Sequence, residues 1–300
     1  MPERGPGGLL HTPPGSHPLG RARRAARRAA GLGRGGPSRR IGAALTLAFV
    51  VLAVAGPHLR GADPFAATGA PFVPPSAAHP FGTDDLGRDV LTGVLHGAST
   101  SLSVGVAVAL ASLALGIVVG GVAGFVGGAV DALLMRLTEL TLVLPRFFLA
   151  LTVVALFGAS LPNLVAVLAL TSWGVVARVV RSGVLAVKVE DHVAAAHALG
   201  AGPLRRLVRH VLPLALGPAF AYAALQVGNA MLVEAGLSFL GFGDPTRVSW
   251  GYLLDVASPY LHRAWWTSVF PGAALAAAVL GVNLLADGLR TGTGGGDLLR

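Results

Sequence analysis

The sequence contains no cysteine and only one lysine, Lys188, among its 300 residues. Without cysteine the chain has no disulfide framework, no thiol nucleophile and no cysteine-bearing metal site. The lone lysine lies in the sequence AVKVE, so the Gly-Lys-Ser/Thr end of a phosphate-binding Walker A loop is missing. The chain therefore carries no ATPase site of its own, and we identify no catalytic residue in it.

Charged residues are also scarce, at 12% of the chain, against about 25% in an average soluble domain. Long stretches contain no charged residue at all, namely 99–130, 161–177, 212–233 and 264–286. A bilayer requires about 20 predominantly apolar residues for each helix that crosses it. These stretches therefore predict a membrane protein rather than a soluble domain with a large core.

The apolar pattern predicts an all-α membrane protein with about six transmembrane helices. We place them at residues 41–55, 99–121, 131–157, 161–180, 213–234 and 265–286. Glycine is dense within them, as in GIVVGGVAGFVGG from Gly116, which is typical of helices that approach closely in a membrane. The resulting division of the chain is a disordered basic cytoplasmic tail (1–40), a first transmembrane helix (41–56), an external segment (57–98), a five-helix core (99–288) with a cytoplasmic loop at 182–212, and a cytoplasmic tail (289–300).

The positions of arginine and lysine predict the orientation. Placing the amino terminus inside assigns 18 positive residues to the cytoplasm and four to the external segments. Positive residues gather on the cytoplasmic side of membrane proteins, so both termini are expected there. The formal net charge of +9 thus indicates a lipid membrane as partner and not nucleic acid.

A polar segment, EDHVAAAHALGAGPLRRLVRHVLP, interrupts the apolar runs at residues 190–213. Its first part predicts a short helix with acidic residues at its start and Gly200 at its end. In its second part Leu204, Leu207, Val208 and Val211 follow helical spacing, opposite Arg205, Arg206, Arg209 and His210. This pattern predicts an amphipathic helix. A small-faced helix beside it could dock into a cleft on a cytoplasmic partner, or the segment could be a positive loop that only sets topology.

Residues 79–290 resemble the inner-membrane permease subunits of ATP-binding-cassette importers, in particular the dipeptide, oligopeptide and nickel group. In the family's cytoplasmic motif, Ala195 and Ala196 match two alanines and Gly200 matches the glycine, while Leu212 and Pro213 match the final pair; Ala194 stands where the family has glutamate. Further matching segments are HPFGTDDLGRDVL from His79, MRLTELTLVLP from Met135, EAGLSFLGFG from Glu234, SWGYLL from Ser249 and NLLADGLR from Asn283.

The resemblance implies a type I importer permease in the cytoplasmic (inner) membrane, which moves dipeptides or oligopeptides, or alternatively nickel. It implies a second, homologous permease subunit, an extracytoplasmic substrate-binding protein, and two cytoplasmic ATPases that use ATP and Mg and dock on the 190–213 loop. No cofactor is implied for this chain itself. We expect the small face around Ala195 and Ala196 to fit a cleft on the ATPase.

Four charged residues inside or near the helices are candidates for a translocation path or gate. Arg136 and Glu139 are three residues apart and could simply pair with each other. Arg146 follows Pro145 within the third predicted helix, where an arginine is a functional candidate; it could meet a substrate carboxylate or a charge on the partner permease. Glu234 ends the fifth predicted helix, and structural anchoring is favoured there over substrate contact.

Two other classes of protein are alternatives to the importer. An ion-coupled secondary transporter would predict buried carboxylates and an internal repeat with broken helices, and the sequence shows no clear repeat. A membrane enzyme would need clustered reactive residues, and neither HExxH nor GxSxG occurs. The nine histidines do not fall at metal-binding spacing, so no metal site is predicted.

The charge bias generates a test of topology. Epitope tags placed after Arg300 or within residues 190–209 should be inaccessible from outside intact cells, whereas a tag near Ala70 should be labelled. Labelling by a membrane-impermeant reagent measures this. Surface labelling of the 190–209 tag would contradict the predicted orientation.

Overall fold

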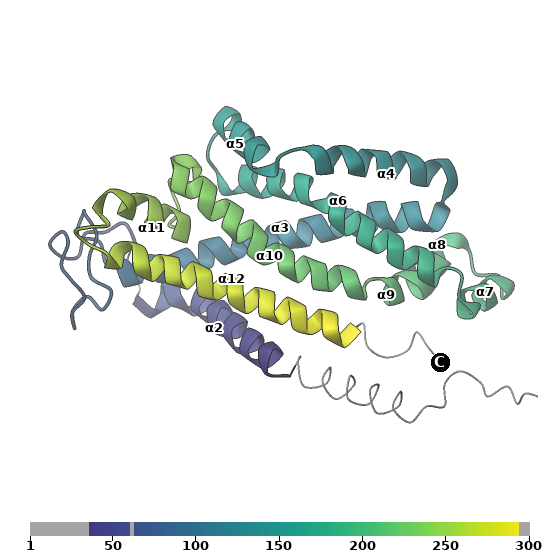
Figure 1. Cartoon of the computed structure of the whole chain (residues 1–300), viewed down its shortest axis with the longest axis horizontal. Coiled ribbons are helices and arrows are strands. Elements are labelled where there is room, and N and C mark those ends of the chain that lie inside the picture. The colour runs from purple at the N-terminus through teal and green to yellow at the C-terminus, as the bar shows by residue number, and fades with distance from the viewer. Residues whose placement is uncertain (1–35, 61–62, 294–300) are drawn as a thin grey trace, which may run out of the picture.

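The computed structural model describes residues 36–60 and 63–293, so most of the predicted tail at 1–40 and the end of the tail at 289–300 lie outside the described residues. The described chain forms an elongated bundle of helices (Figure 1). The α-helices are α2 (Gly36–Arg60), α3 (Val90–Val126), α4 (Gly128–Val143), α5 (Arg146–Phe157), α6 (Leu161–Val187), α7 (Asp191–Ala198), α8 (Pro203–Arg206), α9 (Leu212–Ala215), α10 (Gly217–Leu237), α11 (Trp250–Ala257) and α12 (Trp266–Thr293). Two π-helical turns, η1 (Leu207–Val211) and η2 (Ser238–Phe242), and a 3₁₀ turn, η3 (Ser258–Tyr260), complete the described elements.

Five of these helices are long and apolar enough to cross a membrane, and the bent pair α4 and α5 gives a sixth candidate span. The predicted all-α membrane fold is confirmed. Several of the predicted helices are too short. The helix α3 begins at Val90 rather than at 99, because the Asp89 carboxylate accepts a hydrogen bond from the Thr92 amide and caps it. Likewise α6 continues to Val187, so the polar loop starts at Lys188 and not at 182.

The third predicted helix, 131–157, is not one helix. It divides into α4 and α5, which meet at an angle of 80°. Leu144 and Pro145 between them have extended backbones, with ψ values of 129° and 103°. Proline lacks an amide hydrogen and disfavours helical geometry in the residue before it. The break is therefore the local consequence of Pro145.

Helices α3 and α6 form the centre of the bundle and run in the same direction. Gly116 lies against Val176, Gly120 against the carbonyl of Ala177, and Gly124 against Arg181 and Val184. A side chain at Gly120 would overlap the Ala177 carbonyl oxygen. Glycine at every fourth position thus allows the two backbones to touch, and α10 packs on α3 in the opposite direction through Gly105 and Met231.

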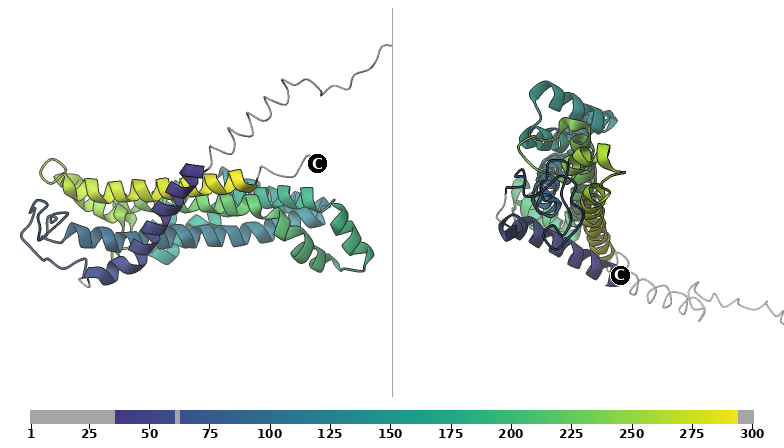
Figure 2. Two further views of the ribbon diagram at one scale, coloured as in Figure 1. Left: turned by 90° about the horizontal axis from the view of Figure 1, so that it is seen from below. Right: turned by 90° about the vertical axis from the view of Figure 1, so that its left-hand side faces the viewer.

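Helices α2 and α12 pack against each other on one side of the bundle. Gly42 lies against the backbone of Leu285, and Gly281 lies against Leu45. The two helices run in opposite directions, and α2 crosses the bundle obliquely (Figure 2). The first and last described helices are therefore direct neighbours.

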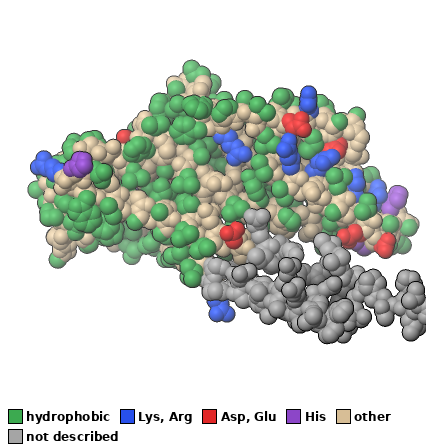
Figure 3. All heavy atoms as spheres, viewed as in Figure 1, with side chains coloured by type: hydrophobic (Ala, Val, Ile, Leu, Met, Phe, Trp, Pro, Cys, Tyr) green, Lys and Arg blue, Asp and Glu red, His purple; other side chains and the backbone are tan. Residues whose placement is uncertain are grey.

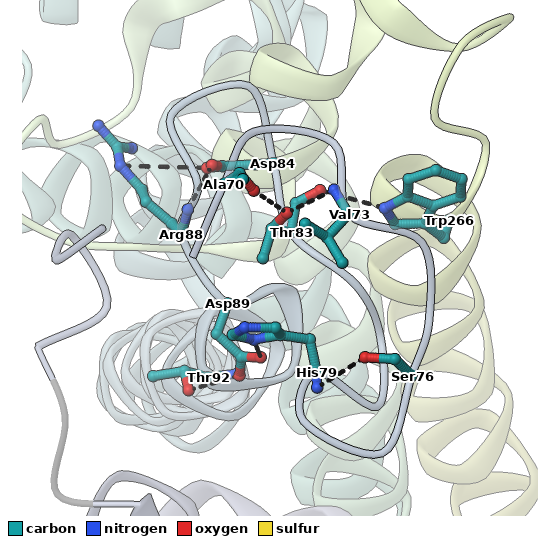
Figure 4. A network of polar contacts seen from close by, with 10 residues as sticks. All are labelled: Ala70, Val73, Ser76, His79, Thr83, Asp84, Arg88, Asp89, Thr92 and Trp266. Atoms are coloured by element: carbon teal, nitrogen blue, oxygen red, sulfur yellow. Dashed lines mark hydrogen bonds and ion pairs between the residues drawn. The ribbon is translucent and has the colours of Figure 1, made fainter. Parts of the chain in front are cut away.

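Residues 63–89, here called the cap, fold over one end of the bundle and are fixed by a polar network (Figure 4). The buried Thr83 hydroxyl donates to the Ala70 carbonyl and accepts from the Val73 amide, and the Thr83 carbonyl accepts from the Trp266 indole. His79 lies 3.1 Å from the Asp89 carboxylate at the start of α3. The cap is thereby tied to α3 and α12 at the end of the bundle opposite α7 (Figure 1).

The contact between α3 and α6 predicts an asymmetry between two adjacent glycines. Gly120→Ala should lower the stability of the purified protein by about 1–3 kcal/mol, since the added methyl group overlaps backbone. Gly121→Ala is the matched control, because its methyl group would meet only Leu212 Cδ2 at 3.5 Å. Thermal unfolding in detergent measures both variants, and equal stability of the two would contradict this account of the packing.

Candidate functional site

The polar loop between α6 and α10 folds as a helical projection at the end of the bundle opposite the cap. The helix α7 begins after Glu190 and ends at Ala198, and Gly200 follows with a left-handed φ of 83°. The Gly200 amide donates to the His197 carbonyl, and the Ala201 amide donates to the Ala196 carbonyl. No atom lies within 4 Å of the position of a Gly200 side chain, so glycine is favoured there by backbone conformation alone.

The faces of α7 differ from the expectation. Val193 and Ala196 are buried and face the bundle, where Val193 packs with Val187 and Val211. Ala196, 8% exposed, is therefore not on the outer face with Ala195, which corrects the predicted docking face. The outer face is formed by Ala194 and Ala195 and continues into Leu199, which is 88% exposed.

The amphipathic pattern of the second part is only partly realised. Val211 is fully buried, but Leu204 is 73% exposed and Val208 is half exposed. The chain forms the π-helical turn η1 from Leu207, and the wider turn shifts the register of the side chains. Arg206 is not on the open face, since its guanidinium lies over the Phe125 ring at 5.7 Å. Leu212 packs on the buried cluster, while Pro213 is exposed in the first turn of α9.

Ionic contacts fix the base of this loop. The Arg181 guanidinium donates two hydrogen bonds to Asp131, each 2.6 Å long, which joins α6 to α4. The Lys188 amine donates to the Gly124 carbonyl at 2.7 Å and joins the end of α6 to α3. Bidentate arginine–carboxylate pairs are geometrically specific. These contacts were not predicted from the sequence, in which the available signal was an isolated Asp131 among apolar residues.

Positive side chains gather at this end of the bundle (Figure 3). Arg136 and Glu139 are 3.5 Å apart, and Arg178 approaches Glu139 at 3.8 Å. All three side chains are at least half exposed, so these pairs contribute little stability. Arg136 and Glu139 thus pair with each other, which is the simpler alternative to a role in a translocation path or gate.

Glu234 lies in α10 and is 1% exposed. Its carboxylate accepts hydrogen bonds from Ser238 at 2.7 Å and from Ser101 of α3 at 3.2 Å. The Ser101 hydroxyl also accepts from the amide of Trp250, the first residue of α11. Glu234 therefore joins α10, α3 and α11, which agrees with structural anchoring. Arg146, at the start of α5, is separate from this cluster and has no hydrogen bond or ion pair with the described residues.

The fold and the loop define a multi-pass membrane protein with a helical projection at the end where its positive residues gather. Residues 116–292 match the family described as the inner membrane component of binding-protein-dependent transport systems, and the chain belongs to this family. It is therefore an inner-membrane component of a transport system.

Individual relatives agree with the family. A putative peptide transport system permease protein of Brucella suis biovar 1 (strain 1330) is 38% identical over 255 residues, which cover 84% of this chain and 85% of the relative. A putative peptide permease protein of the same organism is 40% identical over 219 residues, 72% of each chain. A dipeptide transport system permease protein of Alkalihalophilus pseudofirmus is 36% identical over 253 residues, 83% of each chain.

The anchoring role of Glu234 can be tested by two substitutions. Glu234→Ala should lower the free energy of unfolding by about 1–3 kcal/mol, because the Ser101 and Ser238 hydroxyls lose a buried acceptor. Glu234→Gln retains a hydrogen-bond acceptor, so its free energy of unfolding should fall clearly less. Thermal unfolding in detergent compares them; a loss of transport by Glu234→Gln at unchanged stability would instead indicate contact with substrate.

Proposed function

We propose that the chain is the permease subunit of an ATP-driven importer of dipeptides or oligopeptides. The main support is that relatives at 36–40% identity are named as peptide or dipeptide permeases and align with most of the chain. The bundle supplies the membrane passage, and no Walker A lysine is present to hydrolyse ATP. ATP and Mg are used by two separate cytoplasmic ATPase subunits.

The outer face of α7 and the loop around it form the proposed ATPase-docking surface. We define this surface by its exposed apolar residues Val189, Leu199, Leu204 and Val208, together with Ala194 and Ala195. Isolated exposed apolar residues are ordinary, but a group of them on one projection is typical of a protein-binding site. Ala194 replaces the family's glutamate, so docking here depends on apolar fit rather than on an ion pair.

The buried side of the loop explains how movement at this surface would reach the membrane. Val193 packs in one cluster with Val184 of α6, Val211 and Ala219 of α10. The loop is thus held on two spanning helices, and Lys188 adds a direct bond to α3. Closure of two ATPases around ATP would pull the docked loops, and the helices would follow as rigid bodies.

The complete transporter in this proposal contains a second, homologous permease and an extracytoplasmic substrate-binding protein. The family description itself names dependence on a binding protein. Membership in that family argues against the ion-coupled secondary transporter. The relatives reported above are named for peptides and not for nickel, so peptides are the substrate class that we propose.

The docking proposal predicts different outcomes for two adjacent alanines. Ala195→Trp should block ATPase binding sterically while leaving the loop folded, because Ala195 is exposed. Ala196→Trp should instead disturb the packing of α7 and lower the thermal stability of the permease. Co-purification of the ATPases, ATP-driven peptide uptake and thermal unfolding distinguish these effects.

Thr152→Trp provides the matched control, since Thr152 is exposed on α5 and distant in sequence from the loop. It should retain the ATPases. Normal ATPase retention and uptake in Ala195→Trp would exclude the outer face of α7 as the docking surface. If the unchanged transporter takes up no peptide, the substrate class is wrong.

A further inference from the structure

Arg146 is the only charged residue between Glu139 and Arg178. It lies at the first position of α5 and is partly buried. No described residue accepts a hydrogen bond from its guanidinium or forms an ion pair with it. An arginine in a membrane is costly unless it meets water or a negative group. Its compensation must therefore come from outside the described chain.

The neighbours of Arg146 place it at the depth of the spanning helices and away from both ends of the bundle. Thr141, five residues earlier, lies against Gly174 at the midpoint of α6. Phe147, the next residue, lies against Gly236 near the cap end of α10. Arg146 is therefore between the middle of the spanning region and the cap. By the predicted topology this is the outer half of the membrane.

The backbone beside Arg146 indicates whether the break between α4 and α5 faces lipid. Leu144 and Pro145 are non-helical, and both are exposed on the isolated chain. The last carbonyls of α4 have no following helical turn to bond with. Irregular backbone at membrane depth occurs only where it is buried in protein or lines a water-filled cavity. The break therefore does not face lipid tails.

A groove of about 290 Å³ lies between the bent pair and α6. Val153 and Phe157 line it from α5, and Arg146 precedes them by seven and eleven residues, which places all three on one helical stripe. Thr171 and Asn163 contribute polar groups from α6. The groove is thus mainly apolar. Arg146 is not among its lining residues and lies on the same stripe of α5, at the end where the helix breaks.

We propose that Arg146 binds the carboxylate of the transported peptide as it passes the break between α4 and α5. This inference rests on the proposed peptide-import function. A guanidinium forms bidentate hydrogen bonds with a carboxylate, and every unmodified peptide carries one at its carboxyl terminus. The apolar groove would accept adjacent side chains. Positive charge in the path would thus select anionic ends and keep them from entering lipid.

The test uses the complete transporter in proteoliposomes with its own binding protein. Trialanine is compared with its carboxyl-terminal amide, with uptake measured for the unchanged chain, Arg146→Gln and Arg146→Lys. Arg146→Gln should reduce the uptake of trialanine about tenfold, which is the loss expected for one charge-assisted contact. It should leave uptake of the amide unchanged. Arg146→Lys should restore part of the trialanine uptake.

Controls separate this role from others. Arg178→Gln removes one positive charge nearer the loop end of α6. It should change the uptake of both peptides equally or of neither. Amidated Ala-Asp-Ala and Ala-Asn-Ala show whether a side-chain carboxylate is also recognised. Because the binding protein is unchanged, its own selectivity cancels between variants.

The possible contrary results are distinct. Equal loss of both peptides in Arg146→Gln would overturn carboxylate binding. If that loss also scaled with the anionic lipid content of the vesicles, it would assign Arg146 to lipid headgroups. Loss of the second permease on purification of Arg146→Gln would assign it to a charge between subunits. If the unchanged transporter imports neither peptide, the proposed function fails before this inference is tested.

Discussion

Direct backbone contact between α3 and α6 is the constraint on which the rest of the structure depends. A membrane offers no hydrophobic driving force between helices, so close packing of small residues must hold them together. Gly116, Gly120 and Gly124 supply that packing near the C-terminal end of α3. Since α6 leads directly into the loop, the same contact fixes where the loop leaves the bundle. Asp131 and Lys188 then secure its base with polar bonds.

Much of the fold could be predicted from the sequence because membrane spans are read from an absence of charge. Four spans follow from the uncharged stretches at 99–130, 161–177, 212–233 and 264–286 alone. The exact ends of the spans could not be predicted. The start of α3, for example, depends on the hydrogen bond from the Thr92 amide to the Asp89 carboxylate. The bend in the third span had a visible signal in Pro145, but proline is also tolerated within continuous membrane helices, as Pro271 is in α12. Proline alone does not specify the 80° angle, because α5 also packs on α6 and α10.

The short helix in the loop was predicted, but not which of its faces is exposed. Gly200 marks the end of α7 because left-handed backbone favours glycine, and a single residue carries that signal. In VAAAHA, however, three identical alanines follow one another, so the sequence could not show that Ala196 rather than Ala195 packs inward. The π-helical turn at Leu207 likewise defeats a pattern that assumes 3.6 residues per turn. Glu234 was better assigned, because a buried carboxylate at a helix end requires several donors.

The pairing of α2 with α12 has a consequence for how the chain is made. The first of these helices ends at Arg60 and the second begins at Trp266. At a synthesis rate of about 5–20 residues per second, roughly 10–40 s pass between them. During that time Gly56 can rest on Leu95 of α3, but Gly42 has no α12 to meet. The half of α2 that contains Gly42 therefore remains unpacked on that face until α12 has been synthesised. Packing of α12 is then the last step in the assembly of the bundle.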